Sequence, residues 1–569
     1  MSNKEIIGKL KRTAKLMELH GANDFKIRSY QNAIQRLERI HEPFVNMDES
    51  TLLEIEGLGK SIASIIAEIS KTGTAILLEE YEDQTPVGLK DLMQFRGVGT
   101  KKLRTLWNEF GVEDKSALKI LVNSGQLLSV KGFGEKTVKN LAEIVEFAFE
   151  CEGKTYYSEA EIIGNNIISE LKEVFIDAQI SFVGKLRRKW EVIDAIELLT
   201  DIPLPKLMPV LEKIAKLNYD KKKSGPFSWK GKWIGDINID VIIYPTPSNK
   251  FVANLLLKTG SPEHLGWVIN ETKFRDFIKQ NNWQTEDEYY SNAGLGYCEP
   301  EIREAEWEVP LAMENKLPEL IKLEDLKGIL HNHTTYSDGQ NTVREMAEEC
   351  KSLGYDYLGI TDHSKAASFY ANGMFEERVK LQQDEIDKLN TEFGSFKIFK
   401  GIEADILADG ALDYDNDTLS TFDFVVASIH SGFSMDKTKA TERLITAIAN
   451  PHTTFLGHMT GRILLQRQGY PVDHEAIFNA CAEFGVIIEI NAHPKRLDID
   501  WRWIHRALDK GLILSINPDA HEIAGYNDMK YGVHIGRKGG LTKDQTFNAW
   551  SLNQVEDYFT LRKQLINDQ

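Results

Sequence analysis

The second half of the chain alternates two patterns that together leave few possible folds. From Leu326 onward, seven short runs of β-type residues are separated by stretches with helical spacing, which is typical of a parallel α/β barrel or a doubly wound sheet. Six of the runs end in histidine or carboxylate side chains. Because α/β barrels build their active sites at the carboxyl ends of the strands, these side chains are expected to converge on one mouth. The expected strands are 328–331, 357–362, 396–404, 424–429, 454–456, 485–490 and 512–516.

The clusters at these strand ends indicate a metal site. A single histidine at a strand end is most often structural, but six successive ends that carry ligand-type side chains are not explained in that way. The HxH, DH and DxH spacings within the barrel pattern resemble the PHP (polymerase and histidinol phosphatase) domain, a (β/α)7 barrel that binds up to three metals. All nine ligand positions of that domain find a matching residue: His331, His333, Asp338, His363, Glu403, His430, His458, Asp519 and His521.

This resemblance implies a metal-dependent phosphoesterase. Glu403 would bridge two metals, and we assign the catalytic roles to Glu403, His333 and Asp519. Mixed imidazole and carboxylate ligands suit Mn²⁺, our first expectation, or Zn²⁺ and Fe²⁺ better than Mg²⁺ alone. Such a cluster can activate water at neutral pH and polarise a phosphate ester, so hydrolysis of a phosphoester is expected.

Three glycine pairs mark the N-terminal region, whose apolar residues otherwise follow helical spacing. Each pair has the pattern apolar, any, Gly, apolar, Gly before a helical stretch, at spacings of 40 and 35 residues, and resembles the helix-hairpin-helix motif. The glycines allow a tight turn, and the N–H groups that open the next helix then face an anion such as a DNA phosphate, with purely structural turns as the alternative. The expected DNA contacts are Gly57, Gly59, Gly97, Gly99, Lys101, Lys102, Gly132, Gly134 and Lys136.

The middle of the chain resembles the palm of family X (polymerase beta-like) DNA polymerases. The resemblance rests on the segments 184–199, 239–241 and 259–264, and the order of the parts matches bacterial and archaeal members. Members hold two metals for nucleotidyl transfer with an Asp-x-Asp pair and a third Asp. In this sequence the pair aligns with Ala195 and Glu197, and only Asp240 keeps the expected residue type.

Further departures weaken this polymerase site. Lys185 replaces a serine that helps to hold the triphosphate, and Leu265 replaces an asparagine. We therefore predict lost or weak polymerase activity and, with it, no reliable Mg²⁺ site in the palm. The lysine used by family members with abasic-sugar lyase activity aligns with Ile65, so no such activity is expected. Besides Asp240, the retained residues of the site are Arg187, Arg188, Gly260 and Ser261.

Three arginines have two interpretations each. Arg187 and Arg188 either bind phosphate or form a solvated surface pair. Arg462 lies in a segment, 457–462, that resembles the family X version of the PHP domain. It is a candidate contact for a substrate phosphate, with a surface role as the alternative.

Length and composition agree with several folded domains. The 569 residues exceed one domain several times over, and 42% hydrophobic with 27% charged residues is ordinary for a globular protein. We expect a multidomain α+β and α/β chain. Its parts are an N-terminal helical domain with the first hairpin at 1–85, a fingers-like helix-hairpin-helix domain at 86–150, a palm-like domain at 151–255, a thumb-like domain at 256–320 and a PHP domain at 321–569.

Charge and cysteine content bear on partners and location. The net charge of −18 at first argues against nucleic acid, but residues 1–150 hold 21 basic and 22 acidic side chains, whereas residues 326–569 hold 25 and 35. Phosphate binding needs only local positive charge. The four cysteines are far apart, which favours neither disulfides nor a zinc ribbon, and no apolar run approaches the ~20 residues of a membrane span. We expect a cytoplasmic, nucleoid-associated monomer without membrane contact.

These patterns predict a DNA-repair enzyme. It would bind gapped, nicked or 3′-damaged DNA without sequence preference and use the PHP barrel as a 3′-5′ exonuclease. One alternative is a working DNA polymerase that uses Glu197 and Asp240 and proofreads with the barrel. Others are a small-molecule phosphatase of the histidinol phosphatase type and a DNA-binding scaffold with a structural metal.

Overall fold

Two compact units make up the computed structural model, which describes residues 1–38, 40, 42–235 and 237–567. Unit 1 consists of Met1–Glu152 with the short segment Leu465–Gln468, and unit 2 consists of Gly153–Leu464 with Gly469–Gln569. The break after Glu152 lies close to the sequence-based boundary at 150. The finer division into five domains stays a prediction, because contacts join the palm-like, thumb-like and barrel regions into one unit.

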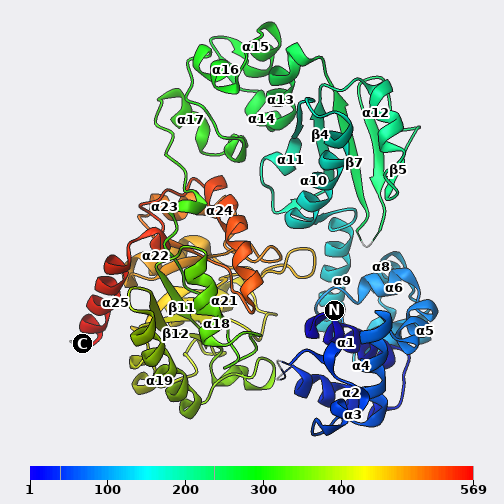
Figure 1. Ribbon diagram of the computed structural model, residues 1–569, viewed down its shortest axis with the longest axis vertical. Coiled ribbons are helices and arrows are strands. Elements are labelled where there is room, and N and C mark those ends of the chain that lie inside the picture. Colours follow the sequence, from blue (N-terminus) through cyan, green and yellow to red (C-terminus); the bar gives the residue numbers. More distant parts are fainter. Residues whose placement is uncertain (39, 41, 236, 568–569) are drawn as a thin grey trace. The chain divides into compact units, whose positions relative to one another are not determined.

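Unit 1 is helical, as the sequence predicts (Figure 1). Apolar residues spaced three and four apart turn one face of each helix into a shared core, for example Tyr30, Ala33 and Ile34 of α2. The glycine turns join three helix pairs, α3–α4, α6–α7 and α8–α9. The helices are α1 (Asn3–Leu19), α2 (Asp24–Leu37), α3 (Glu49–Glu54), α4 (Lys60–Thr72), α5 (Ile76–Gln84), α6 (Val87–Leu92), α7 (Thr100–Phe110), α8 (Lys115–Asn123) and α9 (Glu135–Glu150).

The first part of unit 2 contains a five-stranded sheet in the order β2-β4-β7-β6-β5. Strands β4 and β7 are parallel, and the other neighbours are antiparallel. One face packs against α10 (Tyr157–Val174) and α12 (Leu204–Leu211), and α13 (Phe251–Thr259) covers part of the other. The strands are β2 (Ile180–Phe182), β4 (Ala195–Thr200), β5 (Leu217–Tyr219), β6 (Trp229–Trp233) and β7 (Ile239–Pro245).

A small helical region follows this sheet and has its own core around Phe274, Tyr289 and Tyr290. Its helices, after α13, are α14 (Pro262–Leu265), α15 (Phe274–Gln280), α16 (Glu286–Asn292) and α17 (Glu308–Met313). Short pieces complete this half of unit 2, namely β1 (Thr155–Tyr156) paired with β3 (Val192–Ile193), α11 (Gly184–Arg187), and β8 (Val268–Ile269) paired with β9 (Thr272–Lys273).

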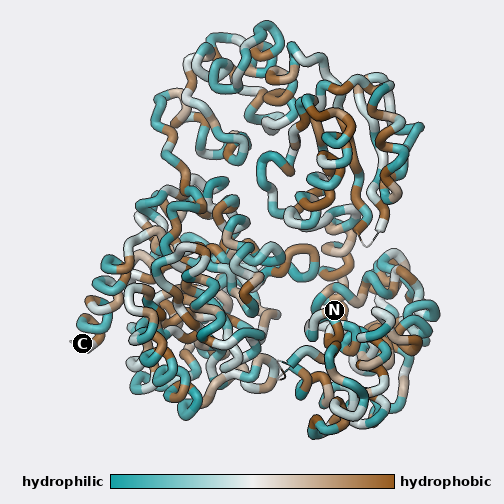
Figure 2. Tube along the Cα trace, in the orientation of Figure 1, coloured by the Kyte–Doolittle hydropathy of each residue, from teal (hydrophilic) through white to brown (hydrophobic). Residues whose placement is uncertain are grey.

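The second part of unit 2 is a nearly closed barrel of seven parallel strands in sequential order, β10 to β16. The strands are buried on both faces, apart from the half-buried Lys397 and Lys400 of β12, which explains the mainly apolar runs of the sequence (Figure 2). The Asn548 side chain joins the first and last strands by donating to the carbonyls of Gly328 and Ile516. The strands are β10 (Gly328–Ile329), β11 (Tyr357–Ile360), β12 (Lys397–Asp405), β13 (Phe424–Ser428), β14 (Thr453–Leu456), β15 (Ile487–Asn491) and β16 (Leu514–Asn517).

Helices surround the barrel strands, and the seven-strand arrangement confirms the (β/α)7 expectation (Figure 1). In the described ranges no single helix is long and apolar enough to cross a membrane, although the pair α4 and α5, bent by 85°, passes the same test on length and composition. The barrel helices are α18 (Val343–Ser352), α19 (Glu376–Phe393), α20 (Asn416–Ser420), α21 (Lys437–Ile448), α22 (His474–Phe484), α23 (Trp501–Asp509), α24 (Met529–Lys538) and α25 (Leu552–Asn567).

Candidate metal centre

Six of the seven barrel strands deliver ligand-type side chains to one end of the barrel. The side chains are His331, His333 and Asp338 after β10, His363 after β11, Glu403 within β12, His430 after β13, His458 after β14, and Asp519 and His521 after β16. All nine residues named from the sequence therefore lie at the carboxyl ends of parallel strands, where α/β barrels place their reactive groups.

Glu403 lies at the centre of this cluster. It is fully buried, and its carboxylate faces five imidazole rings. A carboxylate in such a position has enough neighbours to bridge more than one cation. The nitrogen-to-oxygen distances from Glu403 are 2.9 Å to His363, 3.0 Å to His458, 3.2 Å to His430, 3.5 Å to His331 and 3.6 Å to His333.

The ligand atoms fall into three groups, and within each group they lie within 4.8 Å of one another. The predicted catalytic residues belong to these groups, since Nε2 of His333 lies 3.2 Å from Asp519 Oδ1 and 3.6 Å from Glu403 Oε2. The groups are His333, Asp338, His363 and His521; His331, His333 and Asp519; and His363, Glu403 and His430.

Several buried atoms of the cluster have no hydrogen-bond partner among the described residues. They include Nε2 of His331, both ring nitrogens of His333 and Oε2 of Glu403. A buried polar atom without a partner costs about 1–3 kcal/mol, so this many in one place calls for a ligand. Divalent metals bind imidazole nitrogens and carboxylate oxygens. The donor set therefore fits metal ions.

Electrostatics prepare the cluster for cations. Burial alone would raise the pKa of Glu403, but His430 and His363 hold that pKa well below its usual range. Burial also opposes the charged form of His430, yet Glu403 and Asp405 raise its pKa to about 10. Desolvation lowers the pKa of His333 to about 3. His333 thus presents neutral ring nitrogens, as metal ligation requires.

Two carboxylates that the sequence analysis missed orient the ligands. Nδ1 of His331 donates to Glu489 Oε2 at 2.6 Å, and Nδ1 of His430 donates to Asp405 Oδ1 at 2.5 Å. Such bonds direct the other ring nitrogen, Nε2, toward the metal position. Glu489 lies in β15, the one barrel strand without a predicted ligand. The sequence could have indicated it, because it is the only charged residue in the apolar run 486–490.

The arginine of the predicted phosphate contact is held by neighbouring residues of the barrel. Arg462 is 12% exposed, and its guanidinium donates to Asp500 and to the carbonyls of Arg496 and Leu497. The side chain is thus half-buried and engaged by its neighbours, and a contact with a substrate phosphate stays a prediction. Arg496 lies nearer the metal cluster, with Nε 3.4 Å from Asp519 Oδ2.

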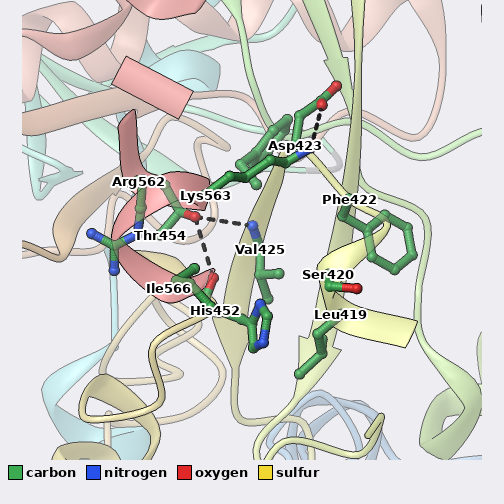
Figure 3. Close-up of a pocket in the computed structure, with 11 residues that line it drawn as sticks. Leu419, Ser420, Phe422, Asp423, Val425, His452, Thr454, Arg562, Lys563 and Ile566 are labelled. Atoms are coloured by element: carbon green, nitrogen blue, oxygen red, sulfur yellow. Dashed lines mark hydrogen bonds and ion pairs between the residues drawn. The ribbon is translucent and has the colours of Figure 1, made fainter. Parts of the chain in front are cut away.

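A separate cavity lies at the opposite ends of β13 and β14 (Figure 3). It opens to solvent, and its walls include His452, Thr454 and Arg562. Lys563 on α25 pairs with Asp423 at 2.8 Å beside it. Because the amino ends of barrel strands usually serve stability rather than chemistry, we interpret this cavity as part of the surface against which α25 packs.

The three glycine turns have the geometry expected of helix-hairpin-helix motifs. Gly57, Gly97 and Gly132 adopt φ values of +88°, +108° and +92°, which side chains other than glycine rarely tolerate. The apolar residue between the two glycines of each turn is buried in the core of unit 1. The second glycine of each turn caps the following helix, namely Gly59 for α4, Gly99 for α7 and Gly134 for α9.

The lysines after these turns remain available to phosphates. Lys101 and Lys136 are exposed, and Nζ of Lys102 lies 3.5 Å from the Thr137 hydroxyl of the third hairpin. Helix N-termini with neighbouring lysines favour phosphate groups.

The palm-like sheet lacks the carboxylate arrangement of a two-metal site. Ala195 lies directly opposite Asp240 on the neighbouring strand, so only one carboxylate of that pair of positions remains. Glu197 accepts a hydrogen bond from the Tyr244 hydroxyl at 2.9 Å, and burial raises its pKa. Lys185 pairs with Asp194 at 2.7 Å. The carboxylate of Glu197 is thus engaged within the protein.

Arg187 and Arg188 have neither of their predicted roles. Arg187 makes a two-pronged ion pair with Glu286 of α16, and Arg188 pairs with Glu304 at 2.8 Å. These pairs are largely buried, which corrects the expectation of free or solvated arginines. They hold the palm-like sheet against the helical region that follows it.

The segment 259–261 is also structural. Ser261 caps the short helix α14 by accepting from the His264 N–H at 3.0 Å. A β-carbon at Gly260 would lie 3.0 Å from Leu265, the residue that replaces the family's asparagine.

Comparison with known proteins extends these observations. A helix-hairpin-helix domain model matches residues 1–75, and a PHP domain model matches residues 330–517. The chain is 34% identical, over 98% of its length, to the DNA polymerase/3′-5′ exonuclease PolX of Bacillus subtilis (strain 168), 99% of which is covered. Over 43% of its length it is 26% identical to a probable phosphatase of Thermoanaerobacter sp. (strain X514), again with 99% covered.

Proposed function

The chain belongs to the PolX family of family X DNA polymerases, with an N-terminal helix-hairpin-helix region and a C-terminal PHP domain, and we propose that this barrel removes nucleotides from the 3′ ends of DNA. The observation that carries the proposal is the cluster of nine ligand-type residues around the buried Glu403. The proposed setting is DNA repair in the cytoplasm, in association with the nucleoid.

The ligand cluster explains how the barrel would hydrolyse a phosphodiester. The three ligand groups would hold divalent metals, with Mn²⁺ the first choice and Zn²⁺ or Fe²⁺ as alternatives. Such metals polarise a phosphate ester and make water a better nucleophile at neutral pH. The protein's own contribution is orientation, since Glu489 and Asp405 fix the Nδ1 protons of His331 and His430 and direct each Nε2 toward Glu403.

The hairpins would hold the DNA substrate. Their glycine turns and following lysines favour phosphate groups and do not read bases, so binding without sequence preference is proposed. Gapped, nicked or 3′-damaged DNA would then be bound by the chain as a monomer. For the palm we propose weak or lost polymerase activity, because Ala195 brings no carboxylate and Glu197 is bound to Tyr244.

The test is a primer-extension assay with the full chain. A 5′-labelled primer on a template is incubated with Mn²⁺, with and without nucleotides, and a His333→Ala variant is compared with a His474→Ala variant, whose ring stacks on Trp503 outside the cluster. Shortening that disappears only in His333→Ala supports the proposal. Lengthening with nucleotides contradicts the weak palm, and no shortening alongside turnover of a small phosphomonoester points to a phosphatase instead.

A further inference from the structure

The barrel segment 364–375, which follows the ligand-type residue His363, turns its large aromatic side chains outward. It buries the smaller Ala367 and Met374 but exposes three aromatic residues within seven positions. A single exposed aromatic side chain is ordinary on a protein surface, whereas several close together often mark a binding surface. The three residues are Phe369, Tyr370 and Phe375.

Tyr370 is the member of this group that lies against the metal centre. Its ring centre is 6.3 Å from that of His363 and 6.1 Å from that of His430. Its hydroxyl donates to Asp405 Oδ2 at 2.9 Å, and the same carboxylate accepts from His430 Nδ1. The side chain is nevertheless 54% exposed. The hydroxyl is therefore held while much of the ring stays open to a molecule in the metal centre.

Hydrogen bonds to the rest of the barrel order the segment that carries this ring. The Met374 N–H donates to the His363 carbonyl at 2.8 Å and so closes the segment into a loop. Nδ2 of Asn372 donates to the Ser337 carbonyl at 3.0 Å. A side chain on an ordered loop loses less conformational freedom on binding than one on a mobile loop. Tyr370 is thus prepared to stack on a planar partner.

We propose that Tyr370 stacks on the base of the 3′-terminal nucleotide and makes the barrel favour strand ends that carry a base. The inference rests on the proposed function, since it places the terminal phosphodiester in the metal centre beside Tyr370. Aromatic side chains bind bases of any identity by stacking, because every base has a flat π-face. Phosphate and sugar offer no such face, so the exposed aromatic group fits the base and not the backbone.

The test separates the ring of Tyr370 from its hydroxyl. Tyr370→Phe keeps a ring and loses the hydrogen bond to Asp405, whereas Tyr370→Leu loses both. The full chain with Mn²⁺ receives two 5′-labelled single strands that differ only at the 3′ end, which carries either adenine or an abasic deoxyribose analogue. The measured quantity is the ratio of kcat/KM for the adenine-ended strand to kcat/KM for the abasic-ended strand. This ratio should be about tenfold lower in Tyr370→Leu than in Tyr370→Phe.

The alternative is that Tyr370 only orients Asp405. Both variants lose that contact, so this role would slow the two strands alike and leave the ratio equal in Tyr370→Phe and Tyr370→Leu, which would overturn the proposal. A ratio that responds to the penultimate base instead would also overturn it. The matched control is Phe484→Leu, which removes an exposed ring at the end of α22, next to the amino end of β15, and should leave the ratio unchanged.

A binding measurement keeps this proposal apart from the exonuclease. A thymidine strand that ends in 3′ 2-aminopurine, whose fluorescence falls on stacking, is titrated with the full chain in Ca²⁺, and the anisotropy of a 5′ dye reports binding. Quenching by the wild type and Tyr370→Phe but not by Tyr370→Leu, without any Mn²⁺-dependent shortening, overturns the exonuclease alone. Shortening of both strands at equal kcat/KM by the wild type, without quenching, overturns the stacking and leaves the exonuclease standing.

Discussion

Replacing Glu489 by glutamine should weaken metal binding in the barrel although Glu489 is not one of the nine predicted ligands. Its carboxylate accepts four hydrogen bonds: His331 Nδ1 at 2.6 Å, Asn517 Nδ2 at 3.2 Å, Asn491 Nδ2 at 2.9 Å and the His458 N–H at 3.1 Å. Each oxygen serves two donors. A glutamine amide has only one oxygen, so two donors face an NH₂ group in either orientation.

The size of the effect follows from these lost contacts. Loss of an outer partner of a metal ligand typically costs 10–100-fold in metal affinity, which corresponds to about 1.4–2.7 kcal/mol. We therefore expect the Mn²⁺ concentration for half-maximal exonuclease activity to rise about 10–100-fold in Glu489→Gln. Saturating Mn²⁺ should restore most of the activity, because all nine ligands remain.

The assay is a Mn²⁺ titration of primer shortening, accompanied by calorimetric Mn²⁺ binding without DNA. Glu475→Gln is the matched control, since Glu475 is exposed on α22 and pairs with Lys510 there. Melting curves of both variants establish that the barrel is folded. An unchanged Mn²⁺ dependence would refute the orienting role of Glu489, and activity that no Mn²⁺ concentration restores would assign it a direct part in the reaction.

Further predictions concern stability. Glu304→Gln leaves the buried Lys538 and Arg188 without their shared anion. It should lower the free energy of unfolding of unit 2, measured by urea denaturation, by about 3–5 kcal/mol. A loss under about 1 kcal/mol would contradict this. Burial lowers the pKa of Lys538 to about 8. Above that pH the unfolded chain binds more protons than the folded chain, so the free energy of unfolding should rise from pH 8 toward 10 in the wild type. Lys538→Met should not show this rise. Gly184→Ala would drive a β-carbon into Glu197 Oε2 at a φ of +61° and should lower the melting temperature; adding Glu197→Ala removes the clash but not the backbone strain, so it should restore only part of the loss. Removal of metal by a chelator should lower the melting temperature of the barrel reversibly, and an unaltered melt would argue against bound metal.

Local patterns were enough to predict the barrel and the cluster of ligand-type side chains at its carboxyl end. Parallel strands buried on both faces appear as apolar runs, and the residue that follows each run must lie at the same end of the barrel. His363 and His458 could therefore be named from sequence position alone. The hairpins could also be predicted from the sequence, because a turn with a positive φ at Gly57 or Gly97 needs glycine whatever residues surround it.

Contacts between distant segments decided the rest. Nothing in the sequence near Arg187 indicates Glu286, 99 residues away, and nothing near His331 indicates Glu489, 158 residues away. Ion pairs of this kind depend on which surfaces the fold brings together, and that outcome is set by packing of whole elements.

The palm-like sheet shows most clearly which properties the sequence determines and which the tertiary structure determines. The sequence by itself determined that Ala195 cannot be a ligand and that lysines are dense between 213 and 233. Only the tertiary structure decided that Lys230 and Lys232 share a face with Asp240, because the side-chain alternation of one strand says nothing about its register against the next. Residue type is a local property that the sequence gives directly. The charge of a surface is the sum over side chains from several strands, and only the pairing and register of those strands bring these side chains together.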